Sequence, residues 1–151
     1  MNSDPRFAYR ESAARAATPV GRVVLLYEQA IQDLGGAVAA IANRDIEGRT
    51  QKISHALLVL GQLQACLDLD RGGEVARNLD RFYTLVKARL LDAQVKASAE
   101  ILREQTDLLL SMRAAWIEVE RTQLEAPATR STADAPPPNL TQPSAPSRWR
   151  A

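Results

Sequence analysis

Residues 18–44 read TPVGRVVLLYEQAIQDLGGAVAAIANR, and this stretch decides the fold. Its apolar residues recur at steps of three and four, which places them on one side of an α-helix. They are Val20, Val23, Val24, Tyr27, Ile31, Leu34, Val38 and Ile41. Thr18 can accept a hydrogen bond from a free backbone N–H at the start of a helix, and proline suits the first helical position. The stretch therefore predicts a long amphipathic helix that begins after Thr18 and ends near Asn43-Arg44.

Three more stretches carry the same helical period. Asp45 is a good N-cap for a second helix, which ends where the pair Gly72-Gly73 permits a sharp reversal of the chain. A third helix follows and ends near Ser98, which can cap the fourth. The fourth helix has Leu102, Leu109 and Trp116 seven residues apart, a heptad spacing. Four apolar stripes with short connections predict an antiparallel four-helix bundle.

Composition supports an all-α fold. Apolar residues make up 46% of the 151-residue chain but aromatic residues only 5%, so the apolar content is mostly that of helix-forming and aliphatic residues. No run alternates with the period of two that a half-buried strand requires. We expect a bundle over residues 18–125, preceded by an extended N-terminal segment, 1–17, and followed by a disordered Pro-rich tail, 126–151.

Net charge, the length of apolar runs and the cysteine content limit the partners and the compartment that we expect for this chain. The 19 basic and 18 acidic side chains nearly cancel, so we expect no nucleic-acid partner. No apolar run is long enough for membrane insertion, and the N-terminus lacks the pattern of a signal peptide. The single cysteine, Cys66, excludes an internal disulfide and suits a reducing compartment. These features predict a cytoplasmic protein.

Motifs for catalysis are missing from the sequence. It has no Gly-rich phosphate loop, no HExxH and no paired cysteines, so we expect no enzyme, no metal, no cofactor and no catalytic residue. One alternative uses His55, because histidine phosphotransfer domains are four-helix bundles with a reactive histidine on the second helix. Those domains supply a lysine and a glycine three and four residues on, where this chain has Leu58 and Val59. Apolar neighbours raise the cost of a phosphoryl dianion, so this alternative is less favoured.

Several short motifs occur in a recognisable order. They are Ala8-Tyr9-Arg10, Leu26-Tyr27-Glu28, LDLDRGGEVARNL at residues 67–79, and Arg113-Ala114-Ala115-Trp116. In this order and spacing, the chain from Ala8 to Val119 resembles the flagellin export chaperones of the FliS family. It departs from the family's pattern at Arg44-Asp45, before the second expected helix, and at Gln94-Val95-Lys96, before the fourth. Both departures lie where we expect connections between helices.

The resemblance implies a function and two partners. A family member binds the disordered C-terminal segment of flagellin, prevents its premature polymerisation and delivers it to the flagellar type III export apparatus, where it meets an export gate component. A homodimer stays open, as does the alternative of a helical adaptor module for another protein. The residues expected at the partner-binding site are Tyr9, Tyr27, Leu58, Val59, Leu69, Gly72, Gly73, Val75, Asn78, Leu79 and Tyr83.

The N-terminal segment, residues 1–17, has an expected role of its own. Phe7 and Tyr9 are two large aromatic residues in an otherwise polar stretch. Apolar rings seek cover, and an unfilled groove on the bundle would offer it. The resemblance to the FliS family implies that this region can lie back on the bundle and be displaced by flagellin. We therefore expect residues 1–17 to act as a lid over part of the partner-binding groove.

Overall fold

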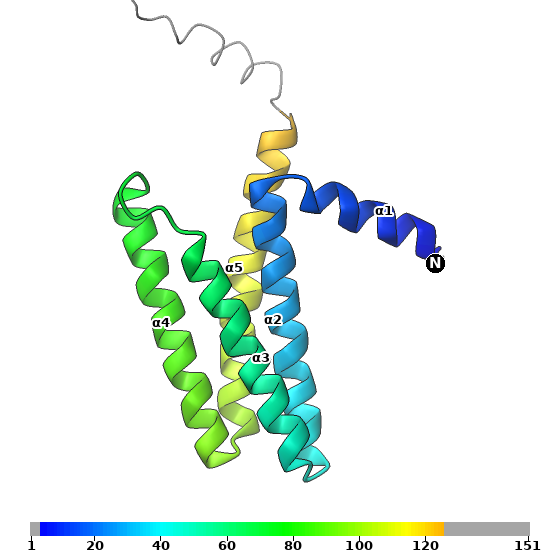
Figure 1. Cartoon of the computed structure of the whole chain (residues 1–151), viewed down its shortest axis with the longest axis vertical. Coiled ribbons are helices and arrows are strands. Elements are labelled where there is room, and N and C mark those ends of the chain that lie inside the picture. The colour runs from blue at the N-terminus through cyan, green and yellow to red at the C-terminus, as the bar shows by residue number, and fades with distance from the viewer. Residues whose placement is uncertain (1–3, 126–151) are drawn as a thin grey trace, which may run out of the picture. The chain divides into compact units, whose positions relative to one another are not determined.

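The structure is a computed structural model that describes residues 4–125, and these residues form five helices and no strand. The helices are α1 (Pro5–Ala16), α2 (Pro19–Ala42), α3 (Ile46–Ala65), α4 (Gly73–Lys96) and α5 (Ala99–Glu125). From α2 to α5 the chain runs alternately down and up (Figure 1). Residues up to Ile117 form one compact unit, and the end of α5 from Glu118 belongs to a second one. The expected all-α bundle is confirmed.

Three helices start at the caps that the sequence predicts. The Thr18 hydroxyl accepts a hydrogen bond from the Gly21 N–H at 2.9 Å. Asp45 accepts one from the Gly48 N–H at 2.9 Å, and the Ser98 hydroxyl accepts one from the Ile101 N–H at 3.1 Å. Each bond satisfies an N–H that the first turn of a helix would leave without a partner.

The three reversals between the bundle helices each use a left-handed backbone residue. Arg44 has φ 57°, Gly73 has φ 59° and Ala97 has φ 51°. Glycine adopts this conformation freely, whereas the two side-chain-bearing residues pay for it with local strain. The backbone compensates with hydrogen bonds that close the helix ends, from Asp45 N–H to the Ala40 carbonyl and from Ser98 N–H to the Ala93 carbonyl.

The core contains the predicted apolar stripes. Its largest fully buried side chains are Tyr27, Tyr83, Leu34, Ile53, Leu60, Leu63, Leu90, Leu102, Leu109, Val24 and Val86. Buried alanines also line the core: Ala30, Ala37 and Ala40 on α2, and Ala56 on α3. Small side chains allow two helix backbones to approach closely, which suits the packing of α2 against α3.

The N-terminal segment differs from the expectation, because it is a helix and not extended. Asp4 caps α1 by accepting a hydrogen bond from the Arg6 N–H at 3.0 Å, and Pro5 takes the first helical position. The alanines that follow favour a helix. No residue of α1 is buried, and Phe7 and Tyr9 are 61% and 74% exposed. The expected lid is therefore not closed in this structure; α1 leads away from the start of α2 (Figure 1).

Of the second unit, the structure describes residues 118–125. There Arg121 pairs with Glu118 and, at 3.1 Å, with Glu125, all within α5. The expected Pro-rich tail, residues 126–151, lies outside the described residues. Among the helices that the structure describes, none is both long and apolar enough to cross a membrane.

Candidate partner-binding site

An ion pair shows which sides of α4 and α5 face each other. Arg89 on α4 lies 3.6 Å from Glu104 on α5. One and two turns before Arg89, on the same side of α4, come Leu85 and Phe82. Because the two helices are antiparallel, residues at matching heights on α5 come after Glu104, and these include Leu108 and Met112.

We call this surface the α4–α5 face. Its members are apolar residues on the facing sides of the two helices: Val75, Phe82 and Leu85 on α4, and Leu108, Met112 and Ala115 on α5. Val75 is 69% exposed, Leu85 66% and Leu108 47%, while Phe82 and Met112 are half-buried. Soluble proteins rarely leave several large apolar side chains exposed together unless a partner covers them.

The α4–α5 face lies over the packed core of the bundle. The Phe82 ring packs on the Tyr83 ring, with 5.7 Å between ring centroids, and Tyr83 and Leu109 are fully buried. Two arginines near the face are held in ion pairs: Arg89 also binds Asp92 at 3.0 Å, and Arg77 binds Glu74 at 3.1 Å. The face can therefore accept apolar side chains, and it offers no group suited to covalent chemistry.

Three of the predicted site residues lie in the first turns of α4. Val75 and Asn78 are exposed on its first turns, and the Asn78 side-chain oxygen accepts a hydrogen bond from Arg81 at 2.7 Å. Leu79 is half-buried and packs against the core. Val75 belongs to the α4–α5 face, and Asn78 and Leu79 lie next to it in sequence.

The turn that leads into α4, residues 66–73, contains three more predicted residues. Leu69 is 47% exposed. A side chain at Gly72 would collide with Ala76 and with the Asp68 carbonyl, and Gly73 has the left-handed φ of 59°. The turn itself therefore requires the two glycines, whatever the loop binds.

Three predicted site residues are core residues, which corrects the expectation. Tyr27, Val59 and Tyr83 are 0%, 3% and 1% exposed. A partner cannot reach them in this conformation, because the neighbouring helices cover the sides on which they lie. The last two predicted residues, Leu58 on α3 and Tyr9 on α1, are exposed but lie outside the α4–α5 face.

The two buried tyrosines share a hydrogen bond between their hydroxyl groups, which are 2.8 Å apart. Burial raises the pKa of both hydroxyl groups. The neighbouring Tyr27 raises the pKa of Tyr83 further, whereas Tyr83 and Trp116 offset a smaller part of the rise in the pKa of Tyr27. The buried Trp116 indole nitrogen lies near Tyr27 without meeting the geometry of a hydrogen bond. This cluster joins α2, α4 and α5 as neutral, structural groups.

His55 has a structural partner. Its Nδ1 lies 2.6 Å from a carboxylate oxygen of Asp33, whose side chain is buried and also accepts a hydrogen bond from Gln29 at 3.2 Å. The imidazole is half-exposed. The third and fourth residues after His55 are the apolar Leu58, which is exposed, and Val59, which is buried, so neither brings a cation to the imidazole. This arrangement favours a link between α2 and α3 over phosphotransfer. Among the described residues, no cluster of side chains is suited to holding a metal ion.

Phe82, Leu108 and Met112 belong to the α4–α5 face but are not among the residues that the sequence predicts at the partner-binding site. A signal for them existed. α5 has Leu108 and Leu109 side by side, and α4 has Phe82 and Leu85 around Tyr83, so each helix has more large apolar residues per turn than one core side can bury. The surplus indicates a second apolar surface, but not which residues form it.

Comparison with known proteins gives consistent matches. The model of the family described as "Flagellar protein FliS" matches residues 1–123. A flagellar secretion chaperone FliSB from Pseudomonas aeruginosa is 33% identical over 106 residues, 70% of this chain and 84% of the relative. Flagellar secretion chaperones FliS from Salmonella typhimurium and Vibrio cholerae are 30% and 27% identical, each over 72% of this chain and 82% and 80% of the relative.

Proposed function

Because the chain belongs to the FliS family of flagellar export chaperones, which are not enzymes, we propose that it binds the C-terminal segment of flagellin on the α4–α5 face. Bound there, the segment is kept from polymerising and is delivered to the flagellar type III export apparatus. The observation that carries this proposal is the exposure of Val75 and Leu85 on α4, on either side of the half-buried Phe82, together with the exposed Leu108 on α5.

The dimensions of the face suit a helical ligand. Between Val75 and Arg89, α4 rises about 21 Å, or roughly four helical turns. An amphipathic helix can lay apolar side chains at positions i, i+3 or i+4, and i+7 along such a surface. We expect flagellin residues with this spacing to contact the face.

Energetics require a long contact. Burying one Leu or Ile anchor contributes about 1.5–3 kcal/mol, whereas ordering each residue of a disordered ligand costs about 1–2 kcal/mol. A few anchors on a long unstructured segment therefore bind weakly. The flagellin segment must place many anchors along the bundle, so contacts with the loop at Leu69 and with the start of α4 extend the same site.

Delivery needs a second contact, and we place it on α1. This helix presents Phe7 and Tyr9 outward beside Arg6 and Arg10, with no residue buried against the bundle. An export gate component in the cytoplasm can recognise such an aromatic and basic helix while flagellin occupies the α4–α5 face. Gate binding at α1 leaves the apolar face free for cargo.

Calorimetry with a flagellin C-terminal peptide tests the site. Leu85 and Leu58 are each 66% exposed, the first inside the α4–α5 face and the second outside it, so they form a matched pair. Leu85→Gln should weaken binding about tenfold, which corresponds to about 1.4 kcal/mol. Leu58→Gln should change it less than about twofold, on the scale of a surface substitution.

Other outcomes would redirect the proposal. Equal losses from both variants would mean that the segment also follows α3, and no loss from either would exclude the α4–α5 face.

Binding should also show a negative heat-capacity change and a gain of helix in circular dichroism, since the ligand folds on apolar surface. A helical adaptor for a different protein would leave the flagellin peptide unbound.

A further inference from the structure

Glu28 on α2 joins three helices through one carboxylate oxygen. Arg113 on α5 donates two hydrogen bonds to Oε2 of Glu28, from Nε at 3.0 Å and from Nη2 at 2.6 Å. Arg15, at the end of α1, approaches the same oxygen at 3.7 Å. All three side chains are about one-third exposed, at 32%, 34% and 32%. One acceptor is therefore shared between α5, which holds it closely, and α1, which holds it loosely.

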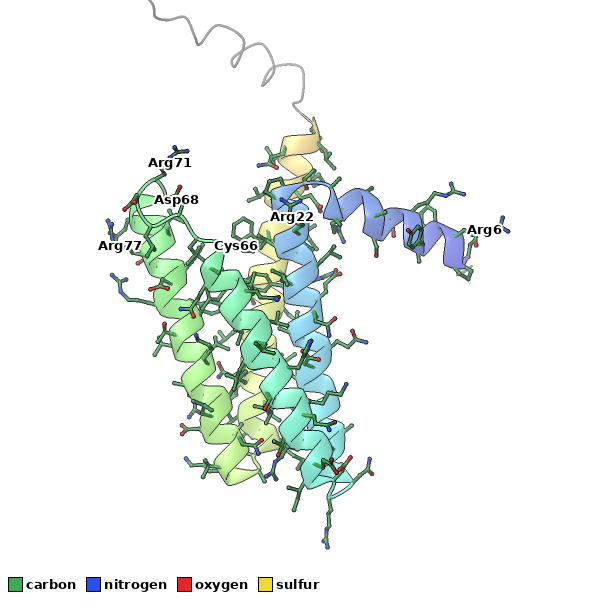
Figure 2. All side chains as sticks on the ribbon, in the orientation of Figure 1. Arg6, Arg22, Cys66, Asp68, Arg71 and Arg77 are labelled. Carbon is green, nitrogen blue, oxygen red and sulfur yellow. The ribbon has the colours of Figure 1, made fainter. Side chains whose placement is uncertain are left out.

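The shared contact lies close to the corner where the chain passes from α1 into α2, and this corner holds α1 in place. Arg22, at the corner in Figure 2, donates a hydrogen bond to the Ala16 carbonyl at 3.0 Å, and the Thr18 N–H donates one to the Arg15 carbonyl. Gly21 lets α1 come this close, because a side chain there would overlap the Arg15 carbonyl. Since α1 buries no residue, these contacts near its last turn contribute to its pose.

The other end of the link lies beside the binding site. Arg113 directly follows Met112 and stands two residues before Ala115, both of which belong to the α4–α5 face. A ligand that packs on this face contacts the same turns of α5 that carry Arg113. Any shift of these turns changes how firmly Arg113 holds the Glu28 oxygen.

We infer that Glu28 couples the α4–α5 face to the pose of α1. When Arg113 holds Glu28 less closely, the carboxylate turns to Arg15 and fixes α1 more firmly; when Arg113 holds it more closely, α1 is freer. The occupancy of the face is thereby reported at Phe7 and Tyr9, on the opposite end of α1. The reporting of cargo rests on the proposed function, whereas the link between α5 and α1 does not.

Amide hydrogen exchange of α1 tests the link without any ligand. Arg113 has no described contact with α1, yet Arg113→Gln should slow exchange in α1 about twofold or more, since Arg15 then has the carboxylate to itself; the size is that of a partly exposed ion pair. Glu28→Gln should speed exchange by a similar factor. The double variant should match Glu28→Gln alone, because the acceptor is already lost.

A matched control separates this link from a general change in charge. Arg103→Gln removes the same charge from an exposed position of α5 and should leave exchange in α1 unchanged. If Arg113→Gln leaves exchange in α1 unchanged or speeds it, the link does not exist. A further effect of Arg113→Gln in the Glu28→Gln background would equally exclude Glu28 as the shared group.

A flagellin C-terminal peptide, with binding checked by calorimetry, tests the coupling to cargo. Saturating peptide should change exchange in α1 of the native protein about twofold or more and should leave the Glu28→Gln variant unaffected. A peptide that binds without changing exchange in α1 overturns the coupling and leaves the proposed function intact. A peptide that fails to bind overturns the proposed function, and the Arg113 variants still decide the link.

Discussion

Single residues show how a polar group can hold an apolar core together. Tyr27 and Tyr83 are as buried as any leucine of the bundle, yet their hydroxyl groups meet at 2.8 Å. A buried hydroxyl without a partner costs more than the hydrogen bond itself contributes, so each tyrosine needs the other. The pair therefore specifies how α2 and α4 are aligned, in addition to filling volume.

Removing one hydroxyl should cost more than removing both. Tyr83→Phe leaves the Tyr27 hydroxyl buried without its partner and should lower the free energy of unfolding by about 1–3 kcal/mol. Tyr27→Phe should have a similar effect, and the double variant should lose less than the sum of the two. Urea denaturation measures all three. Strict additivity would show that the two hydroxyl groups do not depend on each other.

The same pair should make the fold sensitive to alkali. Burial raises the pKa of both hydroxyl groups above that of an exposed tyrosine, so the folded state keeps its protons while the unfolded chain loses them. Their contribution is complete below about pH 10, the pKa of a free tyrosine, and is lost as pH rises above it. Circular dichroism against pH should show unfolding on the alkaline side, and the double Phe variant should unfold at higher pH than the native protein.

Among the elements, α1 departs most from the expectation. Its sequence has no apolar stripe, so periodicity gave no reason to expect a helix there. Its N-cap, proline and alanines nevertheless favour a helix without burial, and its last turn is held by the corner with α2. A short exposed helix is marginal in isolation, so contacts at this corner help to stabilise α1.

Two glycines of α2 offer opposite tests of this corner. Gly21→Ala places a methyl group on the Arg15 carbonyl and should melt or detach α1, which amide exchange of α1 would report as loss of protection. Gly35→Ala meets nothing within 4 Å on an exposed part of the same helix. It should raise stability by about 0.5–1 kcal/mol, because alanine favours a helix. Protected α1 amides in Gly21→Ala would show that the corner tolerates a side chain.

Deleting residues up to Arg10 tests whether α1 is a lid. A closed lid competes with cargo, so its removal would raise the affinity for a flagellin peptide. In the observed pose Phe7 and Tyr9 cover nothing, and we therefore expect the calorimetric affinity to stay within about twofold, as for a terminus without contacts. A rise of about tenfold would restore the lid, and a clear loss would show that α1 itself contacts flagellin.

At the scale of the whole molecule, the bundle buries one apolar side of each helix and leaves a second exposed between α4 and α5. Such a surface stabilises nothing in the free protein and invites self-association. Its retention is consistent with a chaperone whose cargo covers it. Ion pairs beside the face, such as Arg89 with Glu104, place hydrated charged groups next to the apolar surface.

The C-terminal segment should be dispensable for the bundle. Residues 126–151 lie outside the described residues, and their sequence is rich in Pro, Ser and Thr with few apolar anchors. Deleting them should leave the melting temperature and the affinity for the flagellin peptide nearly unchanged. A large drop in either would show that this segment, through a residue such as Trp149, docks on the bundle.

The sequence by itself determined the presence of the four bundle helices, their caps at Thr18, Asp45 and Ser98, and the turn at Gly72-Gly73, because these depend on neighbours within about four residues. It placed the end of the second helix too late, since α3 ends at Ala65 and a loop leads from there to the two glycines. The tertiary structure alone decided which of two apolar sides each helix buries. It placed Tyr83 in the core and Leu85 on the surface, and it brought Arg113 to Glu28 across 85 positions. Such choices depend on the shape and volume of the helices packed alongside, which no local pattern contains.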